Sequence, residues 1–509
     1  MKTQWMPRLR LALVVLVLLA LGGCRYGLYV KTGSGWIKGQ WADAETRLTR
    51  TFLGIPYAQP PVGEQRFAAP LPVQHWSGVL AAEQFGPSCV QRPGALAASG
   101  EQSEDCLSLN VYTPARVPRG GAPVMVFIHG GAFIAGGSNQ YDGTRLSQEG
   151  NAVVVTLNYR LGALGFLRHP ALPGSGNAAL EDQQLALHWV KENIAAFGGD
   201  PDNITLFGES AGAASVCVHM VAPGSAGIAQ RYILQSGTCS GGLALLNETQ
   251  AEAISVSLEQ QLCADAQDAA ECLRSLDATA LVNWGAGSGL FGAGWAPTVI
   301  AGSDTLPAPV LQLFASGQYN AGATVIGTNR NEWGLFQSVG IASTVSTVAE
   351  LAALIDQQFG PAAPYLKAEY LPAVDALANV ELIRLYSDSV FRCPPRTLAR
   401  VLSQQGIPVW LYSFDQLPAL HAMELPYVFG NPSPVLAPTL VEPLRATVQD
   451  YWTAFASAGD PNQPDQPYWP GYDGATDQHM SLQEASAASA QLAQRSCDLW
   501  DALRMASAQ

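Results

Sequence analysis

The chain has 509 residues and a formal net charge of −14, because 41 acidic residues outnumber 27 lysines and arginines. An acidic surface of this kind repels phosphate backbones, which excludes nucleic acid as an expected partner. Hydrophobic residues make up 48% of the chain, which is enough for a substantial core. The length fits one large α/β domain, since such domains often run this long without division.

The N-terminal segment predicts export and a lipid anchor. Residues 1–10 carry three basic side chains, and residues 11–21 form an uninterrupted apolar run. That run is too short to span a bilayer comfortably and is typical of a secretory signal. It ends at Leu21-Gly22-Gly23-Cys24, which resembles the bacterial lipobox, where the cysteine is acylated and becomes the new N-terminus.

We therefore expect a lipoprotein-type signal peptide over residues 1–23 and a single domain over residues 24–509. Within that domain, only a very short tether is expected between Cys24 and the folded part. Acylated Cys24 would hold the chain at a membrane, and Arg25 after it favours the outer membrane, on its periplasmic side. One alternative is a plain signal peptide with an incidental cysteine, which would leave the protein secreted. The other is a signal anchor.

An exported chain meets an oxidising compartment, where cysteines can pair. Beyond Cys24 there are eight: Cys89, Cys106, Cys217, Cys239, Cys263, Cys272, Cys393 and Cys497. Composition alone does not assign the pairs. The seven histidines and the cysteines show no metal-ligand spacing, so we expect neither a metal site nor another cofactor.

Short strands alternate with helices along most of the chain. Residues 29–32 and 36–37 favour a hairpin, and the apolar runs at 124–128 and 152–159 are typical of strands buried on both faces. A helix over 180–194 follows. Further buried strands are expected at residues 204–207, 232–235, 324–327 and 409–413. This alternation predicts a doubly wound α/β architecture. Residues 486–494, rich in Ala, Gln and Ser, suit either a helix or a loose connection.

Gly208-Glu209-Ser210-Ala211-Gly212 matches G-x-S-x-G, the sharp strand-to-helix turn that exposes a nucleophilic serine. The pattern alone is weak, because it also occurs by chance in chains rich in Gly and Ser. Here an apolar strand precedes it and a run of small residues compatible with a helix follows it, which is the context that the motif needs. We expect Ser210 to be a nucleophile.

A nucleophilic serine needs donors for the oxyanion that forms on attack. His129-Gly130-Gly131-Ala132-Phe133 follows the strand at 124–128, and its small residues let backbone N–H groups point at a substrate. We expect the oxyanion to be bound by the N–H groups of Gly131, Ala132 and Ala211. A simple glycine turn after a strand is the alternative.

The serine also needs a base and an acid that orients it, in the chain order Ser, acid, His. His421 lies in a loop after the strand at 409–413, whereas His479 lies in a polar segment and is expected at the surface. Glu332 follows the strand at 324–327, at a carboxyl end of the predicted sheet, where ligands gather. These positions favour His421 as the base and Glu332 as the acid.

Taken together, these stretches resemble the type-B carboxylesterase family, which includes bacterial para-nitrobenzyl esterases and animal cholinesterases. The resemblance spans roughly residues 30–500. It rests on the serine motif and on four further stretches: Phe52-Leu53-Gly54-Ile55-Pro56-Tyr57-Ala58, Glu104-Asp105-Cys106-Leu107-Ser108-Leu109-Asn110-Val111, Gly327-Thr328-Asn329-Arg330-Asn331-Glu332 and His421-Ala422-Met423-Glu424. Ser108 stands where the family usually has Tyr.

The resemblance implies an α/β-hydrolase fold: a large, mostly parallel central sheet with helices on both faces and an N-terminal antiparallel hairpin. It implies a triad of Ser210, His421 and Glu332 that hydrolyses small to medium carboxylic esters through an acyl-enzyme. The family also places Glu209, Ser236 and Glu424 in support of the triad, although a merely structural role fits each of them equally well.

The resemblance also implies three disulfides: Cys89 with Cys106, Cys263 with Cys272, and Cys393 with Cys497. Cys217 and Cys239 are left over and are expected to be buried thiols. The segment between Cys89 and Cys106 lacks the tryptophan with which cholinesterases bind quaternary ammonium, so a choline ester is not the expected substrate. Trp333 stands where the family commonly has Gly, and we expect it to narrow or reshape the acyl pocket.

Other functions compatible with the scaffold are a non-enzymatic, cholinesterase-like adhesion protein and a lipase, amidase or thioesterase that uses the same triad. Adhesion members characteristically lose a triad residue, whereas this chain keeps Ser210, Glu332 and His421. The expected partners are thus a small ester and, through Cys24, a membrane. The sequence does not indicate an oligomeric state.

Overall fold

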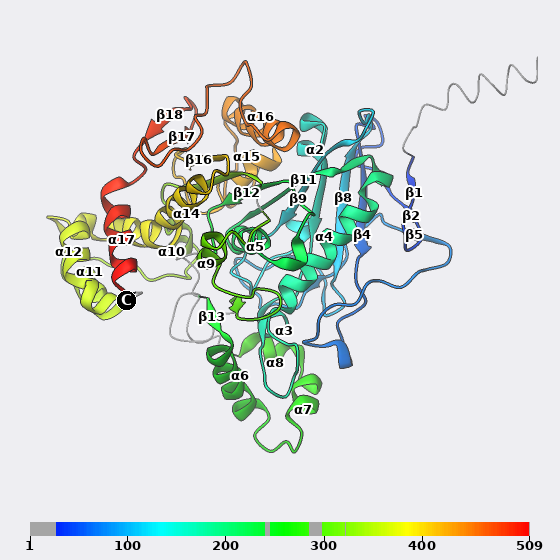
Figure 1. The fold of residues 1–509 in the computed structure, drawn as a ribbon, viewed down its shortest axis with the longest axis horizontal. Helices are drawn as coiled ribbons and strands as arrows, with labels where there is room; N and C mark the ends of the chain where they lie inside the picture. The colour runs from blue at the N-terminus through cyan, green and yellow to red at the C-terminus, as the bar shows by residue number, and fades with distance from the viewer. Residues whose placement is uncertain (1–26, 240–244, 285–297, 321, 508–509) are drawn as a thin grey trace, which may run out of the picture.

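A computed structural model describes residues 27–239, 245–284, 298–320 and 322–507. The predicted signal peptide and Cys24 lie outside these residues. No helix among the described segments is long and apolar enough to cross a membrane. Figure 1 shows a large twisted sheet near the centre, flanked by helices, with two helical lobes at its periphery.

The central sheet has 11 strands in the order β18-β17-β16-β15-β12-β11-β9-β10-β8-β4-β3. Its middle is parallel, as expected from the continuous apolar runs. The parallel strands are β9 (Ala122–Ile128), β10 (Val153–Leu157), β11 (Gly199–Glu209), β12 (Arg231–Gln235), β15 (Ala323–Asn329), β16 (Val409–Phe414) and β17 (Gln478–Leu482). Antiparallel strands complete the edges: β3 (Gln40–Trp41), β4 (Thr49–Pro56), β8 (Ser108–Pro114) and β18 (Ala487–Ala490).

Alternate residues of each strand serve opposite cores. On β9, Val124 and Val126 pack into one hydrophobic cluster, whereas Met125 and Phe127 pack into the other. Helices α4 (Ala178–Phe197), α5 (Ala211–His219) and α14 (Cys393–Gln404) cover the first face. Helices α2 (Thr144–Gly150), α15 (Leu425–Phe429) and α16 (Glu442–Ala458) cover the second. The predicted α/β-hydrolase architecture is therefore confirmed.

Two lobes and three small sheets surround this core. One lobe holds α3 (Gly162–Phe166), α6 (Glu248–Leu262), α7 (Ala269–Ser275) and α8 (Ala278–Asn283). The other holds α11 (Val348–Phe359), α12 (Ala363–Tyr370), α13 (Ala378–Tyr386) and α17 (Gln494–Ser507). Helices α9 (Val310–Ala315) and α10 (Gly334–Ser338) lie nearer the sheet. The small sheets pair β6 (Ser88–Cys89) with β7 (Gln102–Ser103), β13 (Leu246–Asn247) with β14 (Ile300–Ala301), and β1 (Tyr29–Lys31) with β2 (Trp36–Lys38) and β5 (Val79–Ala81).

The structure contains four disulfides, of which three are the pairs that the resemblance implies: Cys89–Cys106, Cys263–Cys272 and Cys393–Cys497. The fourth, Cys217–Cys239, corrects the expectation of two buried thiols. Cys217 lies on α5 and Cys239 lies just beyond β12, so packing of the helix on the sheet brings the two together.

Two further expectations about the C-terminal part are corrected. His479 is buried rather than at the surface, because β17 extends the central sheet and pairs with strands on both sides. Residues 487–490, expected to be helical or loose, form strand β18 at the sheet edge. In both cases, pairing with a neighbouring strand decides the conformation of a polar stretch whose sequence shows no clear hydrophobic periodicity.

A buried ion pair joins the loop after β10 to α4. Arg160 Nε and Nη2 lie 2.8 Å and 2.7 Å from the two carboxylate oxygens of Asp182, and both side chains are buried. Breaking such a pair leaves an unpaired charge in the interior, which is far worse than replacing both partners by apolar groups.

We expect Asp182→Asn to lower the midpoint of thermal unfolding sharply, by the equivalent of about 3–5 kcal/mol. The double variant Arg160→Met/Asp182→Leu should recover most of that loss. Thermal unfolding of the disulfide-intact protein measures both midpoints. A double variant no more stable than the single one would contradict the view that the isolated charge is what destabilises.

Candidate active site

Ser210 lies on a strained turn between β11 and α5. Its φ of 57° and ψ of −123° are unusual for a residue with a side chain and mark a functional strand-to-helix elbow. Its N–H donates to Gln235 O on the neighbouring strand β12 at 2.8 Å. At Gly212 a Cβ would overlap the carbonyl of Ile128 on β9. The glycine is thus required for the helix to approach the sheet, as the motif predicts.

The loop after β9 presents backbone N–H groups to the same cavity. Gly131, Ala132 and Phe133 all have positive φ, at 104°, 54° and 61°, which turns successive peptide groups inward. Gly131, Ala132 and Ala211 line the cavity. Among the hydrogen bonds between described residues, none uses the N–H of these three. They are therefore available as donors to a substrate oxygen.

Sequence reasoning missed the side chains that hold this loop in place. The buried imidazole of His129 stacks on Tyr159 with ring centroids 4.4 Å apart, and Tyr159 OH donates to His129 O at 2.8 Å. Burial lowers the pKa of His129 to about 4, so it is neutral. Gln91 holds the far end, because its amide bonds both the N–H and the carbonyl of Gly136 at 2.8 Å. No motif signals Tyr159 or Gln91, since each acts only through the folded loop.

His421 and Glu332 meet although 89 positions separate them. His421 Nδ1 lies 2.6 Å from Glu332 Oε2, and both side chains are buried. The acid's other oxygen, Oε1, accepts bonds from Thr328 Oγ1 at 2.8 Å and from Asn329 N at 2.6 Å. Asn329 Nδ2 also donates to Leu420 O at 2.7 Å, which ties the loop after β15 to the loop that carries His421.

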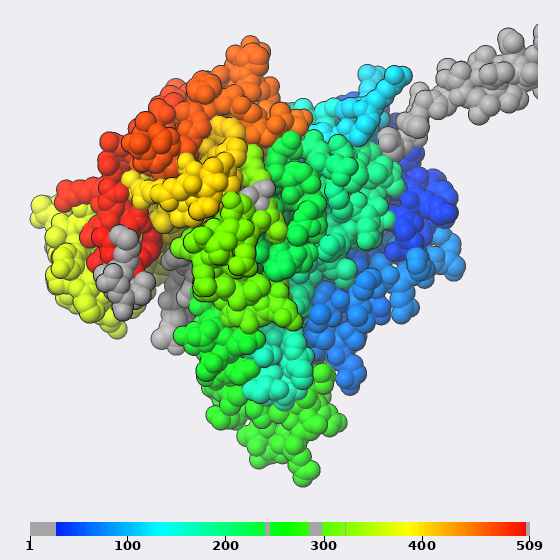
Figure 2. All heavy atoms as spheres, in the orientation of Figure 1, coloured from blue at the N-terminus to red at the C-terminus, as the bar shows by residue number. Residues whose placement is uncertain are grey.

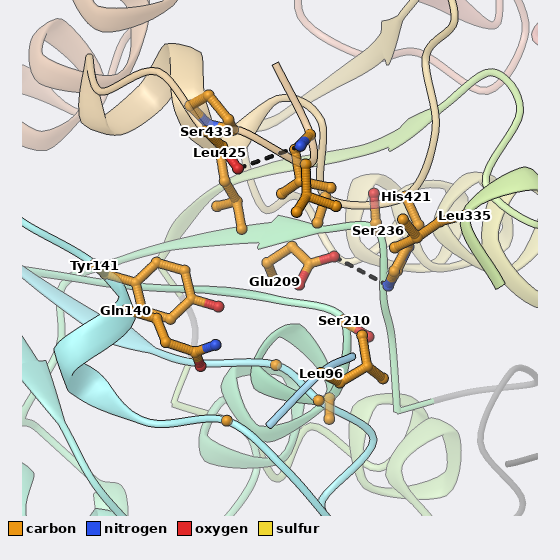
Figure 3. A pocket seen from close by; sticks show the side chains of 18 of the residues that line it. Leu96, Gln140, Tyr141, Glu209, Ser210, Ser236, Leu335, His421, Leu425 and Ser433 are labelled. Atoms are coloured by element: carbon orange, nitrogen blue, oxygen red, sulfur yellow. Dashed lines mark hydrogen bonds and ion pairs between the residues drawn. The ribbon is translucent and has the colours of Figure 1, made fainter. Parts of the chain in front are cut away.

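The other ring nitrogen of His421 faces Glu209. Nε2 lies 3.1 Å from Glu209 Oε1, an ion pair without the alignment of a directed hydrogen bond. Figure 3 shows this pair with Ser210 beside it, in the same cavity. No hydrogen bond between described residues joins Ser210 Oγ to His421. The structure thus places Ser210 and His421 in one cavity, and Glu332 is hydrogen-bonded to the far side of the His421 ring.

Burial and neighbouring charge set the protonation of this cluster. Burial alone would lower the pKa of His421, but the carboxylates of Glu209 and Glu332 outweigh it and raise that pKa to about 9. Burial raises the pKa of Glu209 to about 8, against the attraction of His421. Glu209 and His421 therefore titrate as a pair.

Glu424 lies behind this pair in a buried polar network. Its carboxylate accepts from Asn329 Nδ2 at 2.6 Å and from Gln235 Nε2 at 3.0 Å. Trp452 Nε1 donates in turn to Gln235 Oε1 at 3.2 Å. Burial and the nearby Glu332 raise the pKa of Glu424 to about 7. Glu424 joins the acid loop to β12, the strand whose Gln235 carbonyl holds the N–H of Ser210.

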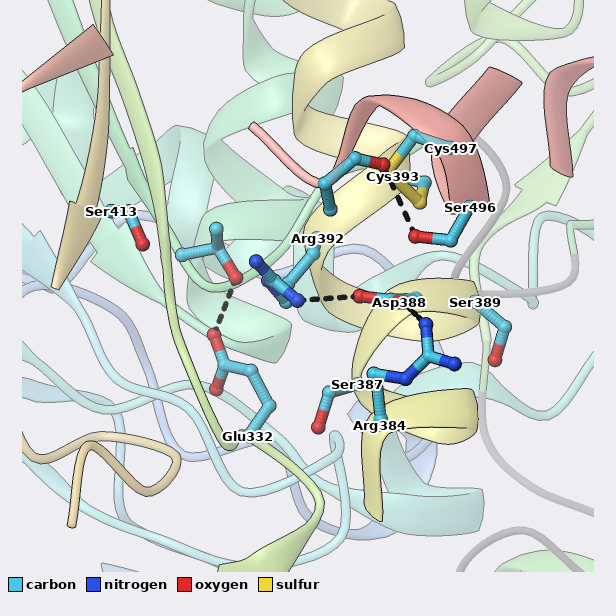
Figure 4. A network of polar contacts seen from close by, with 12 residues as sticks. Glu332, Arg384, Ser387, Asp388, Ser389, Arg392, Cys393, Ser413, Ser496 and Cys497 are labelled. Atoms are coloured by element: carbon cyan, nitrogen blue, oxygen red, sulfur yellow. Dashed lines mark hydrogen bonds and ion pairs between the residues drawn. A yellow bond between two sulfur atoms is a disulfide. The ribbon is translucent and has the colours of Figure 1, made fainter. Parts of the chain in front are cut away.

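Two aromatic rings hold the imidazole, and no sequence pattern indicated them. The ring centroids of Phe391 and Phe336 lie 4.6 Å and 5.1 Å from that of His421. Phe391 belongs to the π-helical turn η7 (Ser387–Arg392), next to the Cys393–Cys497 bridge. Figure 4 shows this turn beside Glu332. Ser387 Oγ accepts from Trp333 N at 3.0 Å, so the turn also supports the acid loop.

The expected effect of Trp333 on the pocket is corrected. Its ring stacks on Tyr386 with centroids 4.3 Å apart, and Trp333 is not among the described residues that line the cavity. It does contact Phe336, which lines the cavity, with ring centroids 5.4 Å apart. Ser236 does line the cavity, and its buried Oγ has no hydrogen-bond partner among the described residues.

The cavity in front of Ser210 has a volume of about 440 Å³ and mainly apolar walls. The walls include Leu96, Leu335, Phe336, Val390, Phe391, Leu425, Phe429, Val435 and Leu436. Leu96 comes from the loop closed by Cys89–Cys106. No lysine or arginine is among the described residues that line it, whereas Glu209 and Asp142 are. Within the described segments, no group of three or more His, Cys, Asp or Glu side chains is placed to hold a metal ion.

An α/β-hydrolase sheet with a serine elbow, a histidine–carboxylate pair and an apolar cavity defines a serine hydrolase. The chain belongs to the carboxylesterase family, whose model matches residues 27–500. It is 35% identical to the para-nitrobenzyl esterase of Bacillus subtilis, over 89% of this chain and 94% of that protein. The fumonisin B1 esterase of Sphingopyxis macrogoltabida is also 35% identical, with 87% and 84% covered. Human carboxylesterase 3 is 33% identical, with 89% and 86% covered. The protein is a carboxylesterase.

We expect Glu209→Gln to move the acidic limb of kcat/KM to lower pH by about one to two units. A histidine that acts as a base must be neutral, which His421 is above its pKa, and removing an adjacent negative charge lowers that pKa. The pH profile of kcat/KM measures the shift. Glu424→Gln is the matched control, because Glu424 raises the pKa of His421 less than Glu209 does. An equal shift in both variants, or none in Glu209→Gln, would contradict this assignment.

Proposed function

We propose that Ser210, His421 and Glu332 form the catalytic triad of this carboxylesterase and that its substrates are small to medium neutral esters. The bond of 2.6 Å between His421 Nδ1 and Glu332 Oε2, with His421 lining the cavity that holds the strained Ser210, carries the proposal. A proton on Nδ1, held by the carboxylate, leaves Nε2 as the basic nitrogen on the cavity side.

In the first half-reaction, Ser210 Oγ attacks the ester carbonyl carbon while its proton passes to His421 Nε2. The carbonyl oxygen becomes an oxyanion that accepts bonds from the N–H groups of Gly131, Ala132 and Ala211. The tetrahedral intermediate then expels the alcohol, which takes the proton from Nε2. Water repeats the sequence on the acyl-enzyme and releases the acid.

Transfer from Ser210 requires Nε2 to turn from Glu209 toward the hydroxyl. The poor alignment of the Glu209–His421 ion pair favours this, because no directed hydrogen bond has to be broken. The rings of Phe336 and Phe391 pack at a tilt against the imidazole and limit its movement. When His421 takes up the proton, Glu209 and Glu332 stabilise the cation from opposite nitrogens.

The cavity favours uncharged, apolar groups on both sides of the ester. Its walls are mainly aliphatic and aromatic, and the described residues that line it include two carboxylic acids, Glu209 and Asp142, but no lysine or arginine. An ester bearing a carboxylate would lose hydration there without gaining a cationic partner. A non-enzymatic adhesion role is not favoured for a member of this family with all three triad residues. A lipase or an amidase would use the same triad and would differ in the substrates that the cavity accepts.

We expect Ser210→Ala to lower kcat for para-nitrophenyl butyrate by at least about 10⁴-fold, since the acyl-enzyme cannot form. Ser433→Ala, at another serine of the same cavity, is the matched control and should keep turnover within about threefold of the parent. Circular dichroism checks that both variants fold. Undiminished turnover in Ser210→Ala would refute the assignment.

The preference for neutral substrates has its own test. We expect kcat/KM to be higher for the neutral para-nitrophenyl butyrate than for the negatively charged para-nitrophenyl hemisuccinate, and the reverse order would refute the neutral-substrate proposal.

We further propose that the enzyme is exported and anchored by acylated Cys24 on the periplasmic side of a bacterial outer membrane. The supporting feature is the sequence Leu21-Gly22-Gly23-Cys24 at the end of an apolar segment of signal length. Cys24→Ala should then abolish acylation of the chain and cleavage of its signal peptide. Globomycin should likewise block maturation of the parent protein. Maturation of Cys24→Ala that matches the parent's, seen by gel mobility and fractionation, would overturn the anchor.

A further inference from the structure

The small sheet at the N-terminal end has one buried and one exposed face. Val30 on β1 and Ile37 on β2 point inward and are buried in the main core. Tyr29, Trp36 and Val79 point outward and are 57%, 45% and 52% exposed. The register places Trp36 beside Val79 across the strand pair. Three large apolar side chains therefore share one open surface.

Two lysines share this surface with the apolar side chains. Lys31 lies opposite Trp36 in the β1–β2 register, and Lys38 lies opposite Tyr29. The whole chain has only five lysines, so two on three short strands is a marked concentration. None of the nine residues of β1, β2 and β5 is acidic, although Lys38 pairs with Glu83 just beyond β5 at 2.6 Å. We refer to Tyr29, Lys31, Trp36, Lys38 and Val79 as the N-terminal face.

We propose that the N-terminal face rests in the headgroup region of the membrane that carries the lipid anchor. The inference builds on the proposed acylation of Cys24. Tyr29 follows Cys24 by five positions, which limits their separation to about 18 Å even for a fully extended chain. The face must therefore stay close to the bilayer surface. Figure 2 shows the N-terminal segment in dark blue at one end of the molecule, away from the C-terminal segment in red.

The chemistry of the face suits this location. Trp and Tyr gather at membrane–water interfaces, where an apolar ring and a polar edge are both accommodated. Lysines attract anionic headgroups and are favoured beside the bilayer. Glu83 offsets the charge of Lys38, but Lys31 still gives the face a local charge opposite to the net charge of −14, which would otherwise repel an anionic membrane.

A second copy of the chain is the less favoured occupant. Three strands of three residues cover only about 100 Å² at the usual strand spacing, against roughly 800 Å² per partner in a stable dimer. A symmetric contact would also bring the lysines of the two copies together. A membrane needs no such area, because the lipid anchor already holds the chain in place.

The test compares the reactivity of lysines in membranes and in detergent. The full chain is produced in a bacterium that processes lipoproteins, and its isolated membranes are treated with a water-soluble amine-reactive ester. Peptide mass spectrometry then measures the modification of each lysine. We expect Lys31 to react at least about threefold less in membranes than in detergent. Lys191 and Lys367, on other elements, are internal references and should react alike in both.

A double variant separates contact of the face from mere tethering. Tyr29→Ser/Trp36→Ser should restore Lys31 reactivity in membranes to its level in detergent. Tyr365→Ser/Tyr468→Ser, at aromatic residues that are 61% and 72% exposed elsewhere, is the matched control and should leave the protection intact. Turnover of para-nitrophenyl butyrate should be unchanged in both variants, which shows that each one folds.

Equal reactivity of Lys31 in membranes and in detergent, with the chain in the membrane fraction, would overturn the proposal while the anchor stands. Protection that persists in detergent and disappears on dilution would identify a second copy and also overturn it. A chain absent from the membrane fraction would refute the anchor instead. The measurement of lysine modification is then repeated with the protein in vesicles of phosphatidylcholine and phosphatidylglycerol. Protection of Lys31 there supports contact between the N-terminal face and the membrane, and its absence refutes that contact.

Discussion

The hydrogen bond between Glu332 and His421 is the interaction on which the site depends. It joins the loops after two adjacent parallel strands, β15 and β16, at their carboxyl ends. Asn329 and Asn331 reinforce the connection with bonds to the backbone of the histidine loop. The bond favours a proton on Nδ1, which in the proposed mechanism leaves Nε2 free to take the proton of Ser210. Without the bond, the proposed nucleophile would lack an oriented base.

Three glutamates surround this imidazole in the interior, which makes its charge state a collective property. Glu332 bonds Nδ1, Glu209 faces Nε2, and Glu424 lies behind them in a network with Gln235. Burial raises the pKa values of Glu209 and Glu424, and repulsion from the neighbouring carboxylates adds to this effect. The arrangement favours a positively charged His421, the state that follows proton abstraction from the serine.

Much of the architecture is predictable because its signals are local. The apolar runs of β9 to β16 mark strands buried on both faces, and the glycines around Ser210 mark an elbow that needs close backbone packing. The features that escaped prediction are created by tertiary contact. Cys217 and Cys239 pair because α5 packs beside β12. His479 is buried because two strands flank β17. The contacts of Phe391 and Phe336 with His421, and the stacking of Trp333 on Tyr386, have no pattern along the chain that would reveal them.

The central claim is that one particular serine becomes acylated, and a covalent probe tests it most directly. Besides Ser433, the cavity is lined by Ser210 at the elbow and by Ser236, whose buried hydroxyl has no hydrogen-bond partner among the described residues. A para-nitrophenyl phosphonate transfers its phosphonyl group to the activated serine of a hydrolase, and peptide mass spectrometry locates the adduct. The account predicts a single stoichiometric adduct on Ser210, formed faster as His421 loses its proton. An adduct on Ser236, or none on Ser210 in an active preparation, would contradict it.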